Sequence, residues 1–337
     1  QKLVNKPKLV TSNGKEIIPF SIPIVREINP ILDTFSILRL VFLINQIKPD
    51  VIHAHSAKGG VIARIASMFF NIKVLYTPHA FSYLSTGNKF KKFLYVTIEK
   101  ILRTKNTIIL ATSNSEKNQA IQAVGYEKKK VFVLKNAIDK RSIREDKDLE
   151  KILKSKTYIC TVGRPSFQKN LEMLIRAFEI VSKKNNKVHL FIIGAGEYSP
   201  RKAKIVNMIN KKNLNTRVTI LPWVSRKEVQ TYIKNAKLYV SSSRYEGMPY
   251  SVIESMALSI PSVLTNTDGN RDLVIDKISG YLVEIGDYVE MANKIMNLLN
   301  KSELRKKLAF EANKLFMQNH LLSNYMQKLT AHYQKHS

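Results

Sequence analysis

Short apolar runs alternate with longer amphipathic stretches along most of the chain, and this alternation constrains the fold more than any other feature. Residues 107–111 form a run with the length of a buried strand, whereas residues 31–47 repeat apolar side chains at helical spacing. Strands that alternate with helices build parallel βαβ units. The other predicted strands are 51–53, 72–76, 131–134, 157–162, 188–193, 218–221, 238–242 and 261–265, and the other helices include 60–70, 90–102, 115–124 ended by Gly125, and one begun by a capping box at Ser225.

A polar segment at residues 139–150 interrupts this rhythm without apolar periodicity and is predicted to be a linker. The 337 residues suffice for about two domains. We therefore expect an α/β protein with two Rossmann-like, doubly wound domains, at residues 1–140 and 141–320, facing a central cleft. Ligands of such sheets bind beyond the carboxyl ends of the strands, so the residues that follow each strand are the candidates for a site.

The charge balance is strongly basic, with 55 Lys and Arg against 26 Asp and Glu and a net charge of +29. Such a surface attracts polyanions, including phosphorylated substrates, anionic lipid and nucleic acid. The excess is spread along the whole chain, so a general drift of composition toward Lys is an equal explanation. No basic stripe interleaved with aromatic residues is present, and we expect no nucleic-acid partner.

Cysteine usage and hydropathy indicate the compartment. Cys160 is the single cysteine and lies among apolar residues, which predicts a buried thiol in a reducing, cytoplasmic compartment. The most apolar stretch, residues 35–47, is interrupted by Arg39, and we expect no segment that spans a bilayer.

Two carboxylates eight positions apart follow the predicted strand 238–242. Glu246 is expected in the loop and Glu254 on the helix that follows, with Pro249 in the first helical turn. Gly247 permits close approach of a ligand to the backbone, and the free amides at residues 248–251 suit a phosphate or a sugar hydroxyl. The alternative is an ordinary capped helix with solvated glutamates.

Two cations follow the first strand of the second half. After Gly163, Arg164 can bind a phosphate through two hydrogen bonds, and Lys169 adds a point charge. Together these two cations suit a diphosphate leaving group. The alternative is a pair of ordinary surface cations in a Lys-rich chain.

With these motifs the sequence resembles the retaining GT-B glycosyltransferases of family 4, which move sugars from nucleotide donors. The resemblance spans about residues 16–320. The matching pieces are Glu246 to Glu254, Gly163-Arg164 with Lys169-Asn170, Gly194-Ala195-Gly196-Glu197, Asn136-Ala137-Ile138-Asp139, Pro49 to Ser56 and Tyr76-Thr77-Pro78-His79-Ala80. The resemblance also implies that the final helix, within residues 321–337, crosses back onto the first domain.

The resemblance implies a role for each motif. Glu254 would hold the ribose hydroxyls of the nucleotide, and Glu246 would bind hydroxyls of the donor sugar. Arg164 and Lys169 would stabilise the departing diphosphate. His79 would reach the donor sugar from the other domain. The remaining residues implied in donor binding are Gly163, Gly194, Trp223, which would lie near the base, and Gly247, Met248, Pro249, Tyr250 and Ser251 at the helix start.

The implied reaction retains the anomeric configuration through attack on the face from which the diphosphate leaves, with no dedicated protein base. A glutamate nucleophile at Glu246 is the competing mechanism. We expect a UDP-sugar donor rather than a GDP-sugar, a glycan or polyprenyl-linked lipid acceptor, and a product in capsule, O-antigen or glycolipid synthesis. No bound cofactor is expected.

Transfer is expected to be independent of metal. The only Asp-x-Asp pattern, at residues 146–148, falls in the polar linker and is explained better as a solvated charge cluster. His53 and His55 share a strand face, but no further ligand set surrounds them, which favours satisfied polar residues over a metal site.

Residues 89–105 form a basic amphipathic helix. A helix packed on the core with a solvated basic face is the simpler explanation, and peripheral contact with an anionic inner membrane surface is the alternative. Family members begin with a strand and a glycine-rich loop, whereas this chain offers only residues 12–14 before the apolar run 17–22, so we expect a shortened first domain.

Other functions of the same architecture are a nucleotide-sugar epimerase, which needs no acceptor, and a phosphorylase, which needs inorganic phosphate. A basic binding module without catalytic activity is the third alternative.

Overall fold

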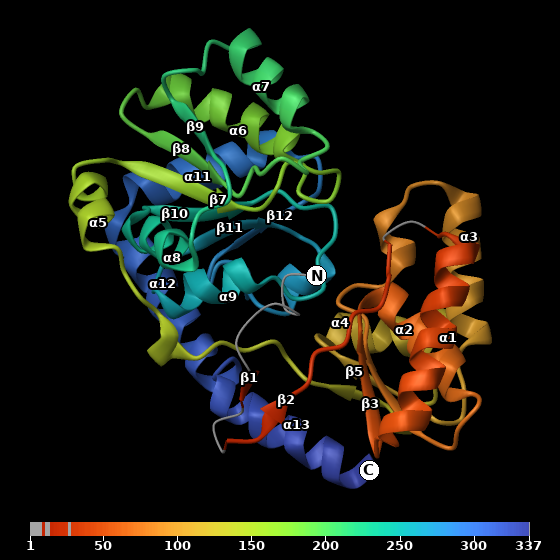
Figure 1. Ribbon diagram of the computed structural model, residues 1–337. Helices are drawn as coiled ribbons and strands as arrows, with labels where there is room; N and C mark the ends of the chain where they lie inside the picture. The colour runs from red at the N-terminus through yellow and green to blue at the C-terminus, as the bar shows by residue number, and fades with distance from the viewer. Residues whose placement is uncertain (1–8, 11–13, 26–27, 337) are drawn as a thin grey trace.

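Two parallel sheets, each covered by helices, make up two lobes in the computed structural model, which describes residues 9–10, 14–25 and 28–336 (Figure 1). The predicted fold class is confirmed. Part of the predicted opening, at residues 12–13, lies outside the described residues. Ahead of the first sheet, β1 (Leu9–Val10) pairs antiparallel with β2 (Glu16–Ile17).

The first sheet has four parallel strands in the order β3-β4-β5-β6. They are β3 (Val51–His55), β4 (Lys73–Thr77), β5 (Thr107–Ala111) and β6 (Val131–Val133), each at a position that the sequence predicts. The main helices of this lobe are α1 (Pro30–Ile47), α2 (Ser56–Ser67), α3 (Lys89–Ile101) and α4 (Asn114–Gln119). Every side chain of β5 is buried, as expected for a strand covered on both faces. Gly125 ends the helical segment after α4 with φ near +87°, as predicted.

The second sheet has six parallel strands in the order β12-β11-β10-β7-β8-β9. They are β7 (Tyr158–Val162), β8 (His189–Ile193), β9 (Val218–Leu221), β10 (Leu238–Ser241), β11 (Ser262–Thr265) and β12 (Tyr281–Val283). Sequence patterns did not predict β12, because three residues are too few to show a period. The buried thiol of Cys160 in β7 confirms the prediction for that residue.

Helices cover both faces of this sheet (Figure 1). On one face lie α6 (Leu171–Lys184), α7 (Lys202–Lys211) and α11 (Tyr288–Asn300), which share one apolar core. On the other face lie α8 (Arg226–Asn235), α9 (Tyr250–Ala257) and much of α12 (Ser302–Asn319). The capping box predicted at Ser225 is present. A short helix, α10 (Asp268–Arg271), follows β11.

The segment 139–150, predicted as a linker, contains helical structure that the sequence did not predict. A 3₁₀ turn at Lys140–Ser142 is followed by α5 (Lys147–Lys154). The side chain of Asp146 caps α5 by accepting from the backbone amides of Asp148 and Leu149, and it also pairs with Lys227 at 3.1 Å. Eight helical residues gave too short an apolar pattern to be distinguished from a polar loop.

Helix α1 differs from expectation in its membrane properties. By length and composition it could cross a bilayer, since its 18 residues have a mean hydropathy of 1.4 and only Ser36, Leu43 and Ile44 are buried. Apolar core helices and signal sequences have the same length and hydropathy. These two properties therefore do not by themselves assign α1 a place in a membrane.

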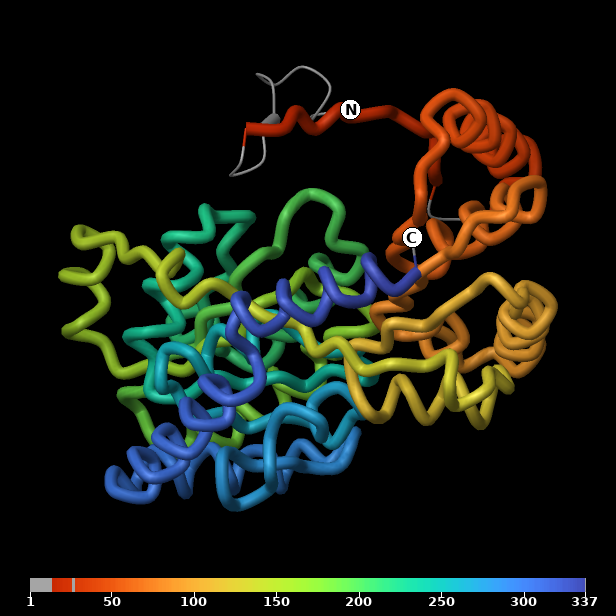
Figure 2. Tube along the Cα trace, turned by 90° about the horizontal axis from the view of Figure 1, so that it is seen from below, coloured from red at the N-terminus to blue at the C-terminus, as the bar shows by residue number. Residues whose placement is uncertain are grey.

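The chain passes between the lobes at two adjacent places. Ile138 and Leu321 form a parallel bridge, in which the Ile138 amide donates to His320 O at 3.0 Å and the Leu322 amide donates to Ile138 O at 3.1 Å. Helix α13 (Leu322–His336) then runs across to the first lobe (Figures 1 and 2). There Leu329 packs in a cluster with Leu75, Ile108 and Leu110 of the first sheet.

The half-buried His53 and the buried His320 make hydrogen bonds at this crossing. His53 of β3 contacts the Tyr333 hydroxyl of α13 through Nδ1 at 2.8 Å, and its Nε2 lies 2.9 Å from the Thr77 hydroxyl. His320 Nδ1 lies 2.8 Å from the carbonyl oxygen of Asn136. Burial lowers the pKa of both imidazoles to about 4, and in His53 the neighbouring His55 contributes as well.

Acid should therefore weaken the docking of α13. The folded state keeps both imidazoles neutral below their ordinary pKa of 6.5, so the unfolded state binds more protons there and stability falls as the pH decreases from 6.5 to 4. Hydrogen exchange of the α13 amides and thermal unfolding across this range measure the effect. Substitution of both histidines, His53→Gln with His320→Gln, should reduce the slope of the profile, with the contribution of His79 remaining, and an unchanged slope in that variant contradicts the assignment.

Candidate active site

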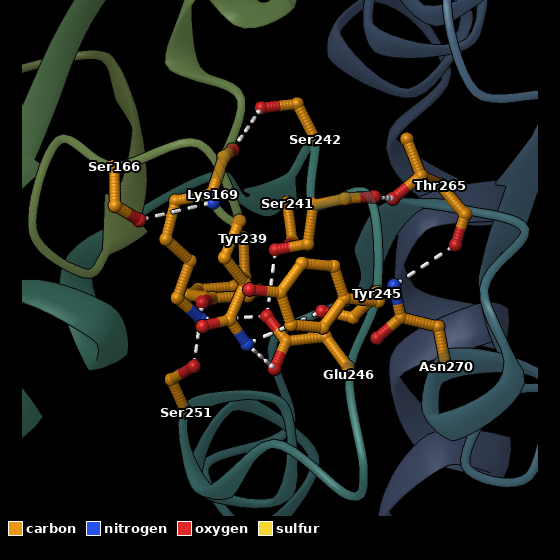
Figure 3. Close-up of polar contacts among 12 residues, drawn as sticks. Ser166, Lys169, Tyr239, Ser241, Ser242, Tyr245, Glu246, Ser251, Thr265 and Asn270 are labelled. Atoms are coloured by element: carbon orange, nitrogen blue, oxygen red, sulfur yellow. Dashed lines mark hydrogen bonds and ion pairs between the residues drawn. The ribbon is translucent and has the colours of Figure 1, made fainter. Parts of the chain in front are cut away.

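The carboxylate of Glu246 is the centre of a hydrogen-bond network at the carboxyl ends of β7 and β10 (Figure 3). Its Oε1 accepts from Lys169 Nζ at 2.7 Å and from the Ser243 hydroxyl at 2.6 Å, and its Oε2 accepts from Gln168 Nε2 at 3.2 Å. The side chain is only 7% exposed. Because β7 and β10 are neighbours in the sheet, the loops that follow them meet, and the two predicted motifs form one site.

Gly163 turns the chain out of β7 toward this network. Its φ of +147° is unfavourable for other residues, and a Cβ there would lie 2.7 Å from Lys169 Cε. The absence of a side chain thus lets the Lys169 stem lie against the backbone, with its ammonium group beside Glu246.

Gly247 is the point at which the first lobe reaches this site. A Cβ on Gly247 would lie 2.8 Å from the Ala80 amide nitrogen and 2.9 Å from the carbonyl carbon of His79. His79 and Ala80 follow β4 with positive φ values of 55° and 77°, an uncommon conformation that is found at functional sites. The Ala80 amide donates to Glu116 Oε1 at 2.6 Å, which helps to hold this turn.

The structure brings the His79 backbone against Gly247, next to Glu246. His79 Nε2 lies 3.0 Å from His55 Nδ1, so at least one of these nitrogens must carry no proton. Burial, with a smaller effect of His55, lowers the pKa of His79 to about 4. The imidazole is therefore neutral near pH 7 and suits a hydrogen bond to a hydroxyl.

The start of α9 differs slightly from prediction. Pro249 is the residue before the helix rather than part of its first turn. The Met248 side chain is buried in the core, and its carbonyl oxygen accepts from Asn136 Nδ2 at 2.8 Å. The Ser251 hydroxyl accepts from Tyr239 at 2.7 Å (Figure 3). Met248 therefore offers a ligand its backbone only, whereas Tyr250 is exposed.

Glu254 lines a cavity of about 580 Å³, within the range of about 300–1,000 Å³ usual for small-molecule sites. Arg226 and Tyr250 contribute to its wall, together with residues 137–139 of the crossing segment. Glu254 is 9% exposed, with Oε1 at 3.5 Å from Arg226 Nε. Burial raises the pKa of Glu254, and Arg226 opposes that shift.

The other predicted donor residues occupy the same edge of the sheet. Arg164 is half-buried and has no acidic partner in the described part of the chain. Gly194 lies against Gly163, but its amide donates to the carbonyl oxygens of Leu221 and Pro222, so its contribution is to the turn. Trp223 is 73% exposed and covers Gly196, where a Cβ would come within 2.6 Å of the indole.

Sequence reasoning missed the residues that orient Glu246. Ser243 lies two residues after β10 and Gln168 lies in the loop after β7, so their positions beyond the carboxyl ends of strands were the available signal. It also missed the contacts between lobes from α4, where the Ser115 amide donates to Asp272 Oδ2 at 2.9 Å and Gln119 donates to Asp268. No pattern along the chain relates residues so far apart.

Together these groups provide a carboxylate that can accept hydrogen bonds from hydroxyls, cations that can neutralise phosphate, and an exposed indole. Among the described residues, no group of three or more His, Cys, Asp and Glu side chains is arranged to hold a metal ion.

Comparison with known proteins gives relatives of matching size. The chain is 27% identical over 300 residues to UDP-Gal:alpha-D-GlcNAc-diphosphoundecaprenol alpha-1,3-galactosyltransferase of Escherichia coli, covering 84% of this chain and 77% of that protein. It is 29% identical over 329 residues to the capsular polysaccharide biosynthesis glycosyltransferase CapM of Staphylococcus aureus, covering 91% and 83%. The structure of Anabaena Alr3699/HepE in complex with UDP-glucose matches with a TM-score of 0.79 at 18% identity, covering 89% and 82%, and shows the same fold.

Two family models divide the chain between them. The model described as Glycosyltransferase Family 4 matches residues 7–141, and the model described as Glycosyl transferases group 1 matches residues 142–315. The second match covers more than half of the chain, and the chain therefore belongs to the group 1 glycosyl transferases and is a glycosyltransferase with the GT-B fold.

Proposed function

We propose that this glycosyltransferase moves a sugar from a UDP-sugar to a lipid-linked or glycan acceptor in the synthesis of a bacterial surface polysaccharide, in the cytoplasm and with retention of configuration. The observation that carries the proposal is the buried Glu246 carboxylate with Lys169 beside it, and with Arg164, which has no acidic partner among the described residues, at the end of the neighbouring strand β7. The hydroxyls of a donor sugar need a carboxylate that accepts their hydrogen bonds, and its diphosphate needs cations. This site has both.

Each group has one part in the reaction. Glu246 and His79 bind hydroxyls of the donor sugar and orient it, and Glu254 holds the ribose. Arg164, Lys169 and the amides at the start of α9 stabilise the negative charge that grows on the diphosphate as the bond to the sugar breaks. These fixed positive groups supply the charge neutralisation for which other transferases use a metal ion, and they support transfer without one.

The contacts of Glu246 favour front-face attack over a covalent glutamyl intermediate. Both carboxylate oxygens already accept hydrogen bonds, and one faces the Lys169 ammonium group, which lowers their power as nucleophiles. In front-face attack, the departing phosphate oxygen takes the proton of the acceptor hydroxyl, so no protein base is needed.

The names of relatives support the donor and acceptor classes. The E. coli relative is named for UDP-galactose and for an acceptor on diphosphoundecaprenol, and the S. aureus relative for capsular polysaccharide. HepE was solved with UDP-glucose. These names agree with a UDP-sugar and a lipid-linked acceptor for this chain.

Donor binding should depend on Glu254. With EDTA present, UDP-sugars should raise the thermal unfolding temperature by mass action, and Glu254→Ala should weaken affinity by about tenfold to a hundredfold, because hydrogen bonds to a charged group are lost. Glu303→Gln, at an exposed position of α12, is the control and should bind as the unmodified chain does. No stabilisation by any nucleotide sugar contradicts the proposal, and stabilisation by GDP-sugars alone corrects the donor class.

Helix α3 supports a contact with anionic membrane within residues 89–105. Phe90 and Phe93 are 74% and 70% exposed, and the neighbouring Lys89, Lys91 and Lys92 are exposed as well, whereas Tyr95 and Val96 pack on the core. An apolar patch surrounded by cations suits a surface of anionic lipid, and a lipid-linked acceptor would be presented there.

Vesicle sedimentation tests this contact. The chain should bind vesicles that contain phosphatidylglycerol more strongly than pure phosphatidylcholine vesicles, and Phe90→Gln with Phe93→Gln should lose most of the binding. Phe310→Gln removes a ring of 68% exposure from α12 and serves as the control. Equal binding by both variants contradicts a role for α3.

A further inference from the structure

A second cavity, of about 280 Å³, lies on the face of the second sheet that α6, α7 and α11 cover. Its wall includes residues from the starts of all three helices, namely Asn170, Arg201 and Tyr288. Its volume lies just below the range of about 300–1,000 Å³ that is usual for small-molecule sites. A ligand of this cavity is therefore small.

The charge around this cavity is strongly positive. Arg176, Arg201, Lys204 and Arg244 line it, against the single carboxylate of Glu172. Arg201 and Lys204 both pair with Glu172, the latter at 3.4 Å, while Arg176 and Arg244 have no acidic partner among the described residues. The cations thus exceed the acids by three in one concave space, which favours an anionic ligand.

The two central guanidinium groups are held in place by an aromatic ring. Arg244 and Arg201 lie 4.3 and 5.1 Å from the centre of the Phe167 ring. Burial and the nearby Arg201 lower the pKa of Arg244, and the Glu172 carboxylate opposes that shift. Fixed guanidinium groups suit recognition of a phosphate through paired hydrogen bonds.

Glu172 adds an unpaired acceptor to the wall. Its side chain is 7% exposed, and its Oε2 is buried with no hydrogen-bond partner in the described part of the chain. A buried carboxylate oxygen without a donor is costly, so a ligand hydroxyl would satisfy it.

We propose that this cavity is a binding site for a phosphate group, either inorganic phosphate or a small phosphate monoester, separate from the donor site. The phosphate lies among Arg176, Arg201, Lys204 and Arg244, and a P–OH or neighbouring hydroxyl of the ligand donates to Glu172.

The loop at residues 163–170 separates this site from the donor site. Lys169 and Gln168 bond to Glu246 on the donor side. On the cavity side, the Arg244 amide donates to Gln168 O at 2.8 Å, and its Nη1 donates to Phe167 O at 2.5 Å. Neither Lys169 nor Glu246 lines the cavity, so the two sites can be tested independently.

Titration calorimetry with inorganic phosphate and with glycerol 3-phosphate, at constant ionic strength, tests the proposal. Arg176→Gln with Lys204→Gln should weaken phosphate binding about tenfold or more. The control, Lys184→Gln with Lys202→Gln, removes the same charge from the same two helices at exposed positions outside the cavity, and it should bind as the unmodified chain does. Circular dichroism confirms that each variant is folded.

A third variant, Arg164→Ala, separates the two sites, because it removes a cation from the donor side only. Phosphate binding that persists in Arg164→Ala supports the proposal. If glycerol 3-phosphate binds more tightly than inorganic phosphate, the ligand is a monoester, and if the two bind equally, the ligand is free phosphate. Equal affinity of the two double variants, or loss of all phosphate binding in Arg164→Ala, overturns it.

Discussion

The buried charge of Glu246 is the constraint on which the site depends. A carboxylate with 7% exposure is unstable inside a protein unless cations and hydrogen-bond donors compensate it. Here Lys169 and Ser243 share one oxygen and Gln168 donates to the other. Because these partners come from the loops after β7 and β10, the ion pair fixes two loops that are 77 positions apart in sequence.

Contacts between the lobes place His79 beside that centre. Gly247 admits the backbone of His79 and Ala80 where any side chain would collide, and Glu116 holds the Ala80 amide. Helix α4 bonds to residues 268 and 272 of the second lobe, and α13 packs back on the first sheet. The first lobe is thus attached near the site and at the crossing segment, which is the arrangement needed to bring an acceptor to a donor.

The sequence predicted the fold because each strand of the two sheets, except β12, is an apolar run between helical patterns. It also placed Glu246, Gly247 and Lys169 after strands of the second sheet, as two motifs that only the family resemblance assigned to one donor. It could not predict that Ser243 and Gln168 hydrogen-bond to Glu246, because local periodicity does not show which strands are neighbours in a sheet. Helix α5 was missed for a related reason, as its stability comes from the Asp146 cap and from packing.

The phosphate cavity shows the same limit more clearly. Arg176, Arg201 and Arg244 lie in three separate segments of a Lys- and Arg-rich chain and carry no signal individually. Only the packing of α6, the start of α7 and the loop after β10 against one another brings their charges together. A general drift of composition toward Lys explains the net positive charge of the whole chain equally well. In this cavity, however, the positive charges surround one concave surface.

The affinities for nucleoside diphosphate and nucleoside monophosphate test the assignment of the site most directly. With the nucleotide that stabilises the chain, the diphosphate should bind more tightly than the monophosphate, and Arg164→Gln or Lys169→Gln should reduce that difference. Glu254→Gln should weaken both ligands and leave their ratio unchanged, because it acts on the ribose. A ratio that is unaffected by the cation variants, or that changes with Glu254→Gln instead, contradicts a diphosphate site at Arg164 and Lys169.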